Sequence, residues 1–252
     1  YVDRLLRGND MKLLEEILNT LPEKHIPIRK VIVGVHWTLV ASKYCGLAST
    51  MVREDQHGHS QVRDVGTLTE KSARELAQWA LSDNLLEASI GMAAINSLLE
   101  LDEHSLKEVN ASEVIAKHCK EKNLVVVGHF PFVERMKTIA RNCWVIEKRP
   151  FGDDFPEEKA QEFLPQADVI AITGTAFINH SIEGLLSLCP SDSIVMVLGP
   201  STPMTPLLFD HGISFLSGSR VIDEEAAITT IQQGASFPQV KGTRLFTMTK
   251  GI

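Results

Sequence analysis

The sequence lacks the features that define several large classes of protein. No apolar run in its 252 residues reaches the roughly 18 residues that a membrane-spanning helix needs. No signal-peptide pattern opens it, and it contains no repeat or low-complexity tract. Its formal net charge of −7 leaves no basic excess for binding phosphates. We therefore expect a cytoplasmic globular protein with no membrane span and no nucleic acid partner.

Cysteine is scarce, and the few cysteines do not form motifs. The four of them are widely separated and include no C-x-x-C pair, which argues against a thiolate zinc site and a redox pair. A disulfide framework is improbable at this length and density. The G-x-S-x-G motif of hydrolases is also absent, and no Ser, His and Asp arrangement follows from order or spacing. We expect buried thiols in a reducing compartment: Cys45, Cys119, Cys143 and Cys189.

The hydrophobic pattern divides the chain into two parts. Residues 1–110 read as a small α+β domain, because β-rich runs at 30–35, 38–41 and 44–52 form an antiparallel meander, followed by helices at 72–81 and 85–101. The small residues Gly91, Ala93 and Ala94 would let another backbone approach the second helix closely. Residues 111–252 alternate strands with helices, and Ser112 is the expected cap of the first helix. This alternation predicts an α/β fold with a doubly wound, mostly parallel, Rossmann-like sheet.

Polar loops follow the predicted strands of the second part. The carboxyl ends of parallel strands gather along one edge of a doubly wound sheet, where ligands bind. Hydroxyls and backbone amides dominate these loops, and such a site suits an anionic or highly polar small molecule. Four of the five loops carry glycine and three carry proline. The loops are 128–131 (GHFP), 147–150 (EKRP), 173–175 (TGT), 199–203 (GPSTP) and 217–219 (SGS).

Two of these loops have competing interpretations. The stretch from Thr173 through Gly174 to Thr175 is either a simple strand-to-helix turn, with Asn179 capping the next helix, or a ligand wall. The 199–203 loop is more rigid than a plain connection requires, and this favours a ligand wall there.

Glu147 follows the second predicted strand, 19 residues after Gly128. Dinucleotide-binding folds place an acid on the ribose at about 20 residues. The G-x-G-x-x-G turn is absent, however, and Pro131 removes an amide that a pyrophosphate would use. This disfavours ordinary nicotinamide binding, and Glu147 remains a candidate for binding a hydroxyl, an amine or a metal.

Histidines supply the other candidate metal ligands. His129 follows Gly128 at the same sheet edge and is either structural or a ligand. His57 and His59 are spaced like a metal-binding pair, but no carboxylate or cysteine at a fitting spacing completes a site, and an exposed turn is the simpler interpretation.

Several motifs occur in one order along almost the whole chain. They are Gly91–Asn96 (GMAAIN), Val127–Pro131 (VGHFP), Glu147–Pro150 (EKRP), the stretch from Ala167 to Asn179, and Leu198–Pro203 (LGPSTP). This succession resembles the heavy-metal-chelation family of uncharacterised prokaryotic proteins, in which an enolase-N-terminal-like domain precedes a Rossmann-like domain. The barrel that holds the catalytic residues of enolase is missing, so enolase chemistry does not carry over.

The resemblance implies a site in the cleft between the two domains. The ligand-binding residues that it and the loops suggest are Asn96, Gly128, His129, Glu147, Thr173, Gly174, Thr175, Asn179, Gly199, Pro200, Ser201 and Thr202. Glu147 and His129 are the candidate ligands for a metal, for which a transition-metal ion is the expected type.

Three functions remain open at this point. The first is binding of a metal, or of a metal-complexing anionic small molecule, in the cleft. The second is a transferase or other enzyme with a nucleotide-type cofactor such as S-adenosylmethionine, whose ribose Glu147 would bind. The third is a non-enzymatic ligand sensor or carrier. A homodimer is expected only because such folds often pair.

Overall fold

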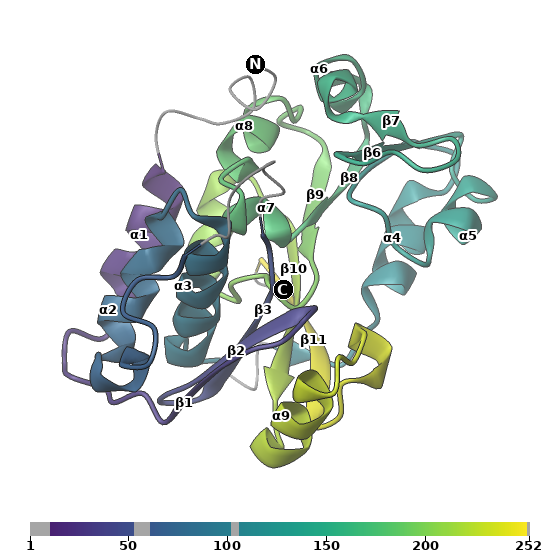
Figure 1. Ribbon diagram of the computed structural model, residues 1–252. Helices are drawn as coiled ribbons and strands as arrows, with labels where there is room; N and C mark the ends of the chain where they lie inside the picture. Colours follow the sequence, from purple (N-terminus) through teal and green to yellow (C-terminus); the bar gives the residue numbers. More distant parts are fainter. Residues whose placement is uncertain (1–10, 53–60, 102–105, 251–252) are drawn as a thin grey trace.

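A large mixed sheet forms the centre of the protein (Figure 1). The computed structural model describes residues 11–52, 61–101 and 106–250. Within these residues the large sheet has eight strands, in the order β4-β11-β10-β9-β8-β5-β6-β7. In sequence order they are β4 (Leu106–Lys107), β5 (Asn123–Val127), β6 (Asn142–Glu147), β7 (Phe155–Pro156), β8 (Val169–Thr173), β9 (Ile194–Leu198), β10 (Phe215–Val221) and β11 (Thr243–Thr249).

The six strands from β10 to β7 are parallel, which confirms the predicted fold class. From β5 the chain moves outward through β6 to β7, then crosses to β8 on the other side of β5 and continues to β9 and β10. The strand order therefore reverses between β5 and β8. In doubly wound sheets, the crevice at such a reversal is where ligands bind. The strand at the carboxyl end of the chain, β11, is antiparallel to β10.

Continuous apolar runs form the central strands because both faces of the sheet are covered. Alternate residues supply two separate hydrophobic clusters: Val125 and Ile170 face one side, while Val126 and Ala171 face the other. The helices α4 (Ala111–Cys119) and α5 (Val133–Lys137) cover the second side. On the first side lie α1 (Lys12–Thr20), α6 (Ala160–Phe163), α7 (Thr175–Ile178), α8 (Ile182–Ser187) and the 3-10 helices η6 (Leu164–Gln166) and η7 (Pro206–His211).

A three-stranded antiparallel meander forms the small sheet, as predicted. It contains β1 (Lys30–Val33), β2 (Trp37–Ala41) and β3 (Cys45–Ser49), and α3 (Leu85–Leu98) packs on one of its faces. A Cβ atom added at Gly46 would lie 2.2 Å from the Ala93 carbonyl oxygen, so glycine is required where β3 meets α3. The remaining elements here are η2 (Leu68–Glu70), α2 (Ala73–Ala77) and η3 (Gln78–Leu81).

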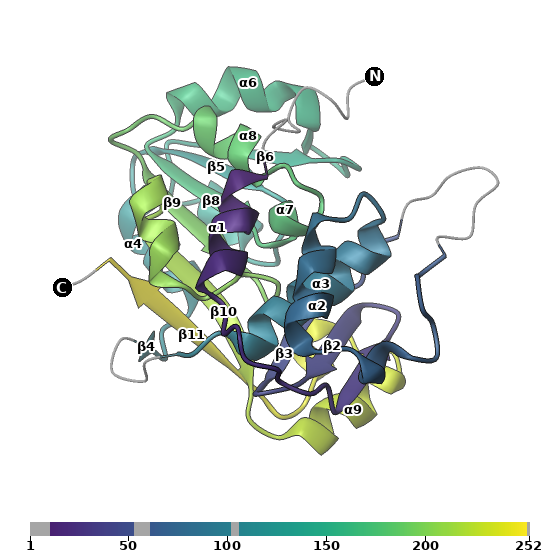
Figure 2. The same ribbon diagram turned by 90° about the vertical axis from the view of Figure 1, so that its left-hand side faces the viewer.

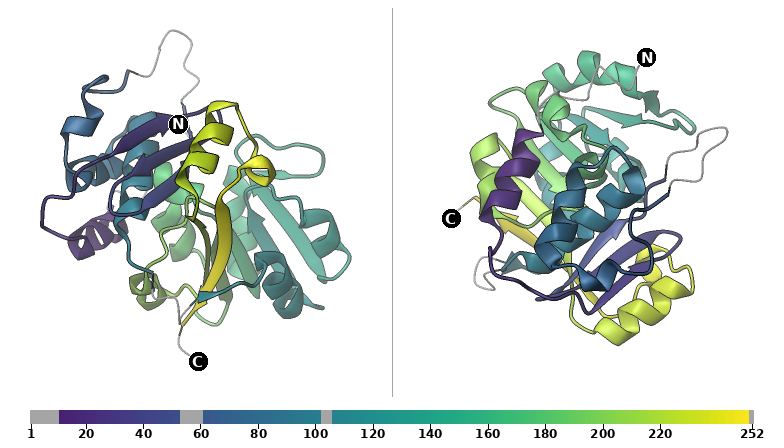
Figure 3. Two further views of the ribbon diagram at one scale, coloured as in Figure 1. Left: turned by 90° about the horizontal axis from the view of Figure 1, so that it is seen from below. Right: turned by 60° about the vertical axis from the view of Figure 1, so that its left-hand side comes forward.

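The other face of the small sheet is covered by a helix from the far end of the chain. This helix is α9 (Glu224–Gln232), followed by the short η8 (Phe237–Gln239). Ala227, Ile228 and Ile231 of α9 share a hydrophobic cluster with Leu39 and Leu47. Figure 3 (left) shows α9 lying against the small sheet.

In the view of Figure 2, α1 lies in front of the large sheet, and its residues Leu13 and Ile17 belong to the hydrophobic cluster on that side. The Leu13 amide donates to the Glu183 carboxylate of α8 at 2.6 Å. One hydrophobic cluster contains Val40 and Ala48 of the small sheet together with Val125 and Ile170 of the large sheet. The domain boundary near residue 110 stays a prediction. No helix in the described ranges is long and apolar enough to cross a membrane.

One local expectation was wrong. Asn110, rather than Ser112, caps α4: its Oδ1 accepts the Ser112 amide at 3.0 Å. Asn and Ser cap helices about equally well, so the pattern alone did not separate two candidates two residues apart.

Candidate functional site

A cavity of about 630 Å³ lies at the carboxyl ends of β5, β6 and β8. Its position coincides with the reversal of strand order between β5 and β8. Thr50, Met51 and Val52, which follow β3, line it from the small-sheet part of the chain, as does Leu85, the first residue of α3. The cavity is therefore lined by both parts of the molecule, and its volume suits a small organic ligand.

Half of the predicted site residues lie on the wall of this cavity. They are Gly128, His129, Glu147, Thr173, Thr175 and Asn179. The others do not line it: Asn96, Gly174, Gly199, Pro200, Ser201 and Thr202. Whether any of these twelve residues binds a ligand stays a prediction. His57 and His59 lie outside the described residues.

The 199–202 loop packs against the small sheet and α3. The Ser49 amide donates to Ser201 Oγ at 2.8 Å, and the Ser201 hydroxyl donates to Ser49 Oγ at 3.1 Å. Asn96 of α3 donates from Nδ2 to the Ser201 carbonyl at 3.5 Å, and also to the Leu47 carbonyl of β3 at 2.9 Å. A Cβ atom at Gly174 would lie 2.6 Å from the Thr202 amide nitrogen, so glycine allows the loop to approach β8. These contacts join the two parts of the chain behind the cavity.

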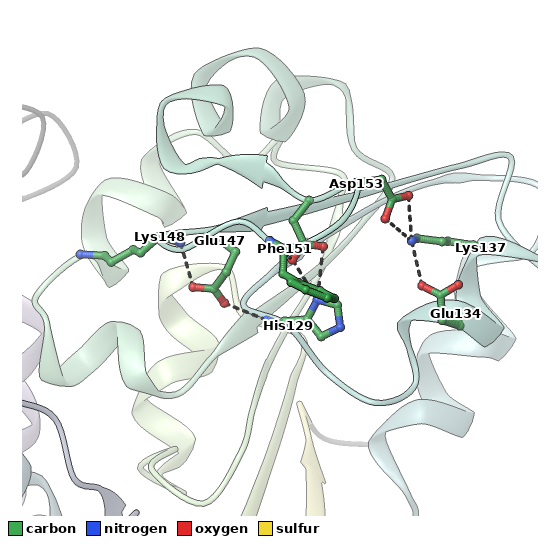
Figure 4. A network of polar contacts seen from close by, with 8 residues as sticks. His129, Glu134, Lys137, Glu147, Lys148, Phe151 and Asp153 are labelled. Carbon is green, nitrogen blue, oxygen red and sulfur yellow. Dashed lines mark hydrogen bonds and ion pairs between the residues drawn. The ribbon is translucent and has the colours of Figure 1, made fainter.

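Glu147 is the last residue of β6, and two main-chain amides fix its carboxylate (Figure 4). The His129 amide donates to Oε2 at 3.0 Å, and the Lys148 amide donates to Oε1 at 2.8 Å. Gly128 makes the first bond possible because its φ of +97° turns the chain sharply after β5. A carboxylate has about four lone-pair positions, so each oxygen can still accept a bond from a ligand.

The His129 imidazole is directed away from Glu147 (Figure 4). Its Nδ1 lies 3.0 Å from Asp154 Oδ2, and the Asp154 side chain is only 1% exposed. In this arrangement the two candidate metal ligands do not converge on one point. Among the described residues, no group of three or more His, Cys, Asp or Glu side chains is placed to hold a metal ion.

A second ionic contact fixes the same segment of chain. Lys137 of α5 lies 2.8 Å from both Asp153 and Glu134 (Figure 4). The hydrogen bonds that Lys137 donates to Asp153 and Glu134 raise the pKa of Lys137, and the bond that Asp153 accepts lowers the pKa of Asp153. Together with the contact between His129 and Asp154, this ion pair holds the loop after β6 against the loop after β5.

The opposite wall of the cavity carries hydroxyl and amide groups. Thr173 and Thr175 lie 3.0 Å apart through their hydroxyls, and the Thr175 amide donates to Thr173 Oγ1 at 3.3 Å. Asn179 ends the short helix α7, and its Oδ1 accepts two bonds from Ser181. The predicted next helix is α8, but its N-cap is Ser181 rather than Asn179, and the short α7, which begins at Thr175, was not predicted.

Some of the lining residues were weakly signalled or not predicted. Lys148 and Arg149 line the cavity, and the sequence pattern alone does not separate a solvated basic side chain from one that faces an anion. Ser181, Glu157 and the residues after β3 were not predicted. Ser181 had a usable signal, because an Asn side chain commonly accepts a hydrogen bond from the backbone amide two residues on, as Asn179 does from Ser181.

The fold defines this chain as a Rossmann-like α/β protein with an added α+β part, and residues of both parts line the cavity at the switch point. Residues 110–250 match the family model DUF364 and residues 14–99 match DUF4213, both described as "Putative heavy-metal chelation". The chain belongs to this heavy-metal-chelation family, as its motifs predicted.

Relatives of the chain share its full length. It is 24% identical to the "Uncharacterized protein MJ0500" of Methanocaldococcus jannaschii, over 94% of this chain and 96% of that protein. A crystal structure of a DUF364 protein of unknown function from Desulfitobacterium hafniense is 25% identical, with a TM-score of 0.84 over 95% of this chain and 98% of that one. A DUF364 structure from Pyrococcus horikoshii, 19% identical, has a TM-score of 0.81 over 97% and 99% and shows the same fold.

Proposed function

We propose that this protein binds a metal-complexing, anionic small molecule in the cavity at the ends of β5, β6 and β8. The observation that carries the proposal is the position of the cavity at the strand-order reversal, with Glu147 fixed on one wall by two amides. Lys148 and Arg149 on the same lining place two positive charges beside the carboxylates of Glu147 and Glu157, and Lys148 Nζ lies 3.6 Å from Glu157 Oε1.

A complexed metal fits the described residues better than a bare ion. Tight protein sites for transition metals use three or four side chains, and the described residues offer no such group. A ligand that brings its own donor atoms removes this requirement. The protein then recognises the organic part of the complex and supplies at most one further ligand, for which Glu147 and His129 remain the alternative candidates.

Equilibrium titration tests this proposal. The wild-type protein is titrated with Zn²⁺ alone and with Zn²⁺ complexes of citrate, malate, iminodiacetate and histidine. We expect stoichiometric binding of at least one complex, a lower affinity for the bare ion, and loss of binding in Glu147→Ala. Glu134→Ala, which removes an exposed acid outside the cavity, is the control. Failure of every complex to bind contradicts the proposal.

A nucleotide-type ligand is the second candidate function. It is favoured by one observation, the location of Glu147 at the end of the strand next to β5, where Rossmann folds bind ribose hydroxyls. The loop after β5 has Pro131 and leads into the five-residue α5, so it offers a poor cradle for a diphosphate. A nucleoside-type ligand without a diphosphate, such as S-adenosylmethionine, fits this loop better than a dinucleotide does. Thermal stabilisation by adenosyl compounds without metal supports this alternative, and indifference to them excludes it.

A further inference from the structure

The side chain of Asn179 has only one of its two polar ends engaged by the protein. Its Oδ1 accepts the Ser181 amide at 3.1 Å and the Ser181 hydroxyl at 2.6 Å. An amide oxygen can accept from both of these donors, whereas an amide nitrogen cannot. The contacts therefore fix which end is oxygen, and they direct the NH₂ group of Asn179 to the other side.

The NH₂ group of Asn179 reaches the cavity. Asn179 is 8% exposed and lies on the cavity lining. Within the described part of the chain, its Nδ2 donates to no protein atom, and it is not enclosed among the fully buried polar atoms that lack a partner. A donor on a nine-tenths buried residue of the cavity lining, with no protein acceptor, has a hydrogen bond to give to a molecule that occupies the cavity.

The turn that carries Asn179 is held from both sides. His180 adopts a left-handed φ of +60°, which a non-glycine residue keeps only where its surroundings impose it. Its Nε2 donates to the Ala80 carbonyl at 2.7 Å, and this bond anchors the turn to the α+β part of the molecule. Asn179 is thus positioned before any ligand arrives.

The neighbouring hydroxyls of Thr173 and Thr175 also offer a hydrogen-bond donor to the cavity. Thr173 Oγ1 accepts the Thr175 amide, and the two hydroxyls share one hydrogen bond, so one hydroxyl hydrogen remains to be donated. Glu147, on the strand ends opposite, can only accept when it is ionised. The cavity therefore has a donor wall at Asn179, Thr173 and Thr175, and an acceptor group at Glu147.

We propose that Asn179 is the specificity-determining donor of the cavity and binds a carboxylate of the ligand, while Glu147 binds a hydroxyl or amine of the same molecule. This inference rests on the proposed function, because it places the ligand in the same cavity. It narrows the ligand to the class of hydroxy- and aminocarboxylates. Such molecules also complex metals through the same groups.

Asn179→Asp separates recognition from structure. Aspartate keeps an oxygen for both Ser181 donors, so the turn is retained, but it replaces the cavity-facing NH₂ with a second, negatively charged oxygen. The probe is the tightest-binding of the Zn²⁺ complexes of citrate, malate, iminodiacetate and histidine, compared with its analogue in which one carboxylate is a primary amide. Isothermal titration measures both for wild type, Asn179→Asp and Ser181→Ala.

We expect Asn179→Asp to weaken binding of the carboxylate probe by about 10- to 100-fold and to prefer the amide analogue, which can donate to it. Ser181→Ala removes one of the two bonds that orient Asn179. It should weaken binding of the carboxylate probe by a smaller factor than Asn179→Asp does. A change of preference between the two probes is not produced by a merely destabilised turn, and unfolding curves check that both variants are folded.

Two results overturn the inference, and they are distinguishable. If the probe binds and Glu147→Ala weakens it while Asn179→Asp leaves affinity and preference unchanged, the role of Asn179 is wrong and the proposed function stands. If no complex in the set binds the wild-type protein, both the role of Asn179 and the proposed function are wrong.

Discussion

The His180 imidazole donates a hydrogen bond from Nε2 to the main-chain oxygen of Ala80 at 2.7 Å, although the two residues are 100 positions apart. His180 is 7% exposed, so this bond is shielded from water. It connects the turn between α7 and α8, which borders the cavity, to η3. The cavity wall is therefore fixed by a contact between the two parts of the chain.

His180→Ala should lower the free energy of unfolding by about 2 kcal/mol, because the Ala80 carbonyl would lose its partner. The measurement is urea denaturation followed by circular dichroism. His211→Ala is the matched control, since it removes another histidine, one whose contact to Glu16 is on the surface. That control should change stability by less than about 0.5 kcal/mol. Equal effects of the two variants would show that the bond to Ala80 contributes nothing.

Gly91→Ala should be strongly destabilising. A Cβ atom there would lie 2.0 Å from the Ala80 main-chain nitrogen, so the backbones of α3 and η3 would have to separate. We expect a loss of more than about 3 kcal/mol, or failure to fold, since overpacking against backbone cannot be relieved by a rotamer change. Gly212→Ala is the control: its Cβ meets no atom within 4 Å, and only its φ of +82° opposes the change. That variant should lose only about 1 kcal/mol. A stable, cooperatively folded Gly91→Ala protein would contradict this packing.

Ser201→Ala should lower stability, because the Ser49 amide would lose its acceptor in a buried contact. The expected loss is about 1–2 kcal/mol. Ser187→Ala, at an exposed hydroxyl that bonds only within its own helix, is the control. Measuring the affinity for the cavity probe in the same variants separates two roles for Ser201. Lower stability with unchanged affinity would show that Ser201 holds the two parts of the chain together. A loss of affinity at unchanged stability would show that Ser201 binds the ligand.

The thiol of Cys45 gives the stability a defined dependence on pH. Burial raises its pKa to about 12, from an ordinary value of 9.0. The folded state thus favours the protonated thiol, and its stabilising contribution is complete below pH 9 and is lost as pH rises from 9 towards 12. The loss should approach about 1.4 kcal/mol per pH unit in this window.

Comparing Cys45→Ala with the wild type isolates this effect. The variant lowers the overall stability by leaving a small void, but its stability should fall less steeply than that of the wild type between pH 9 and 11. Cys45 should also resist thiol reagents at pH 7 in the folded protein. Parallel pH profiles for the two proteins would contradict the protonated, buried state.

Much of the fold was predictable because its strands are buried on both faces. The apolar runs from Leu124 and from Val169 had no other plausible structure at their length. The carboxyl ends of parallel strands lie at one edge of a sheet, and this places Gly128, Glu147 and Thr173 close together. These predictions needed only local pattern and the geometry of parallel sheets.

Long-range packing was not predictable in the same way. The apolar face of α9, with Ala227 and Ile231, shows that the helix packs on something but not that its partner is the small sheet. Likewise, nothing in the sequence around Ser201 specifies its contact with Ser49, which lies 152 positions earlier. The orientation of the His129 imidazole towards Asp154 depends on how two loops meet.

Native mass spectrometry combined with elemental analysis of the protein as purified, without added metal, tests the central claim most directly. We predict that wild-type protein carries a bound species containing both an organic component and one transition-metal ion, and that Glu147→Ala loses both together while Glu134→Ala retains them. A stoichiometric metal ion without an organic component, or a bound complex that Glu147→Ala retains in full, would contradict the account.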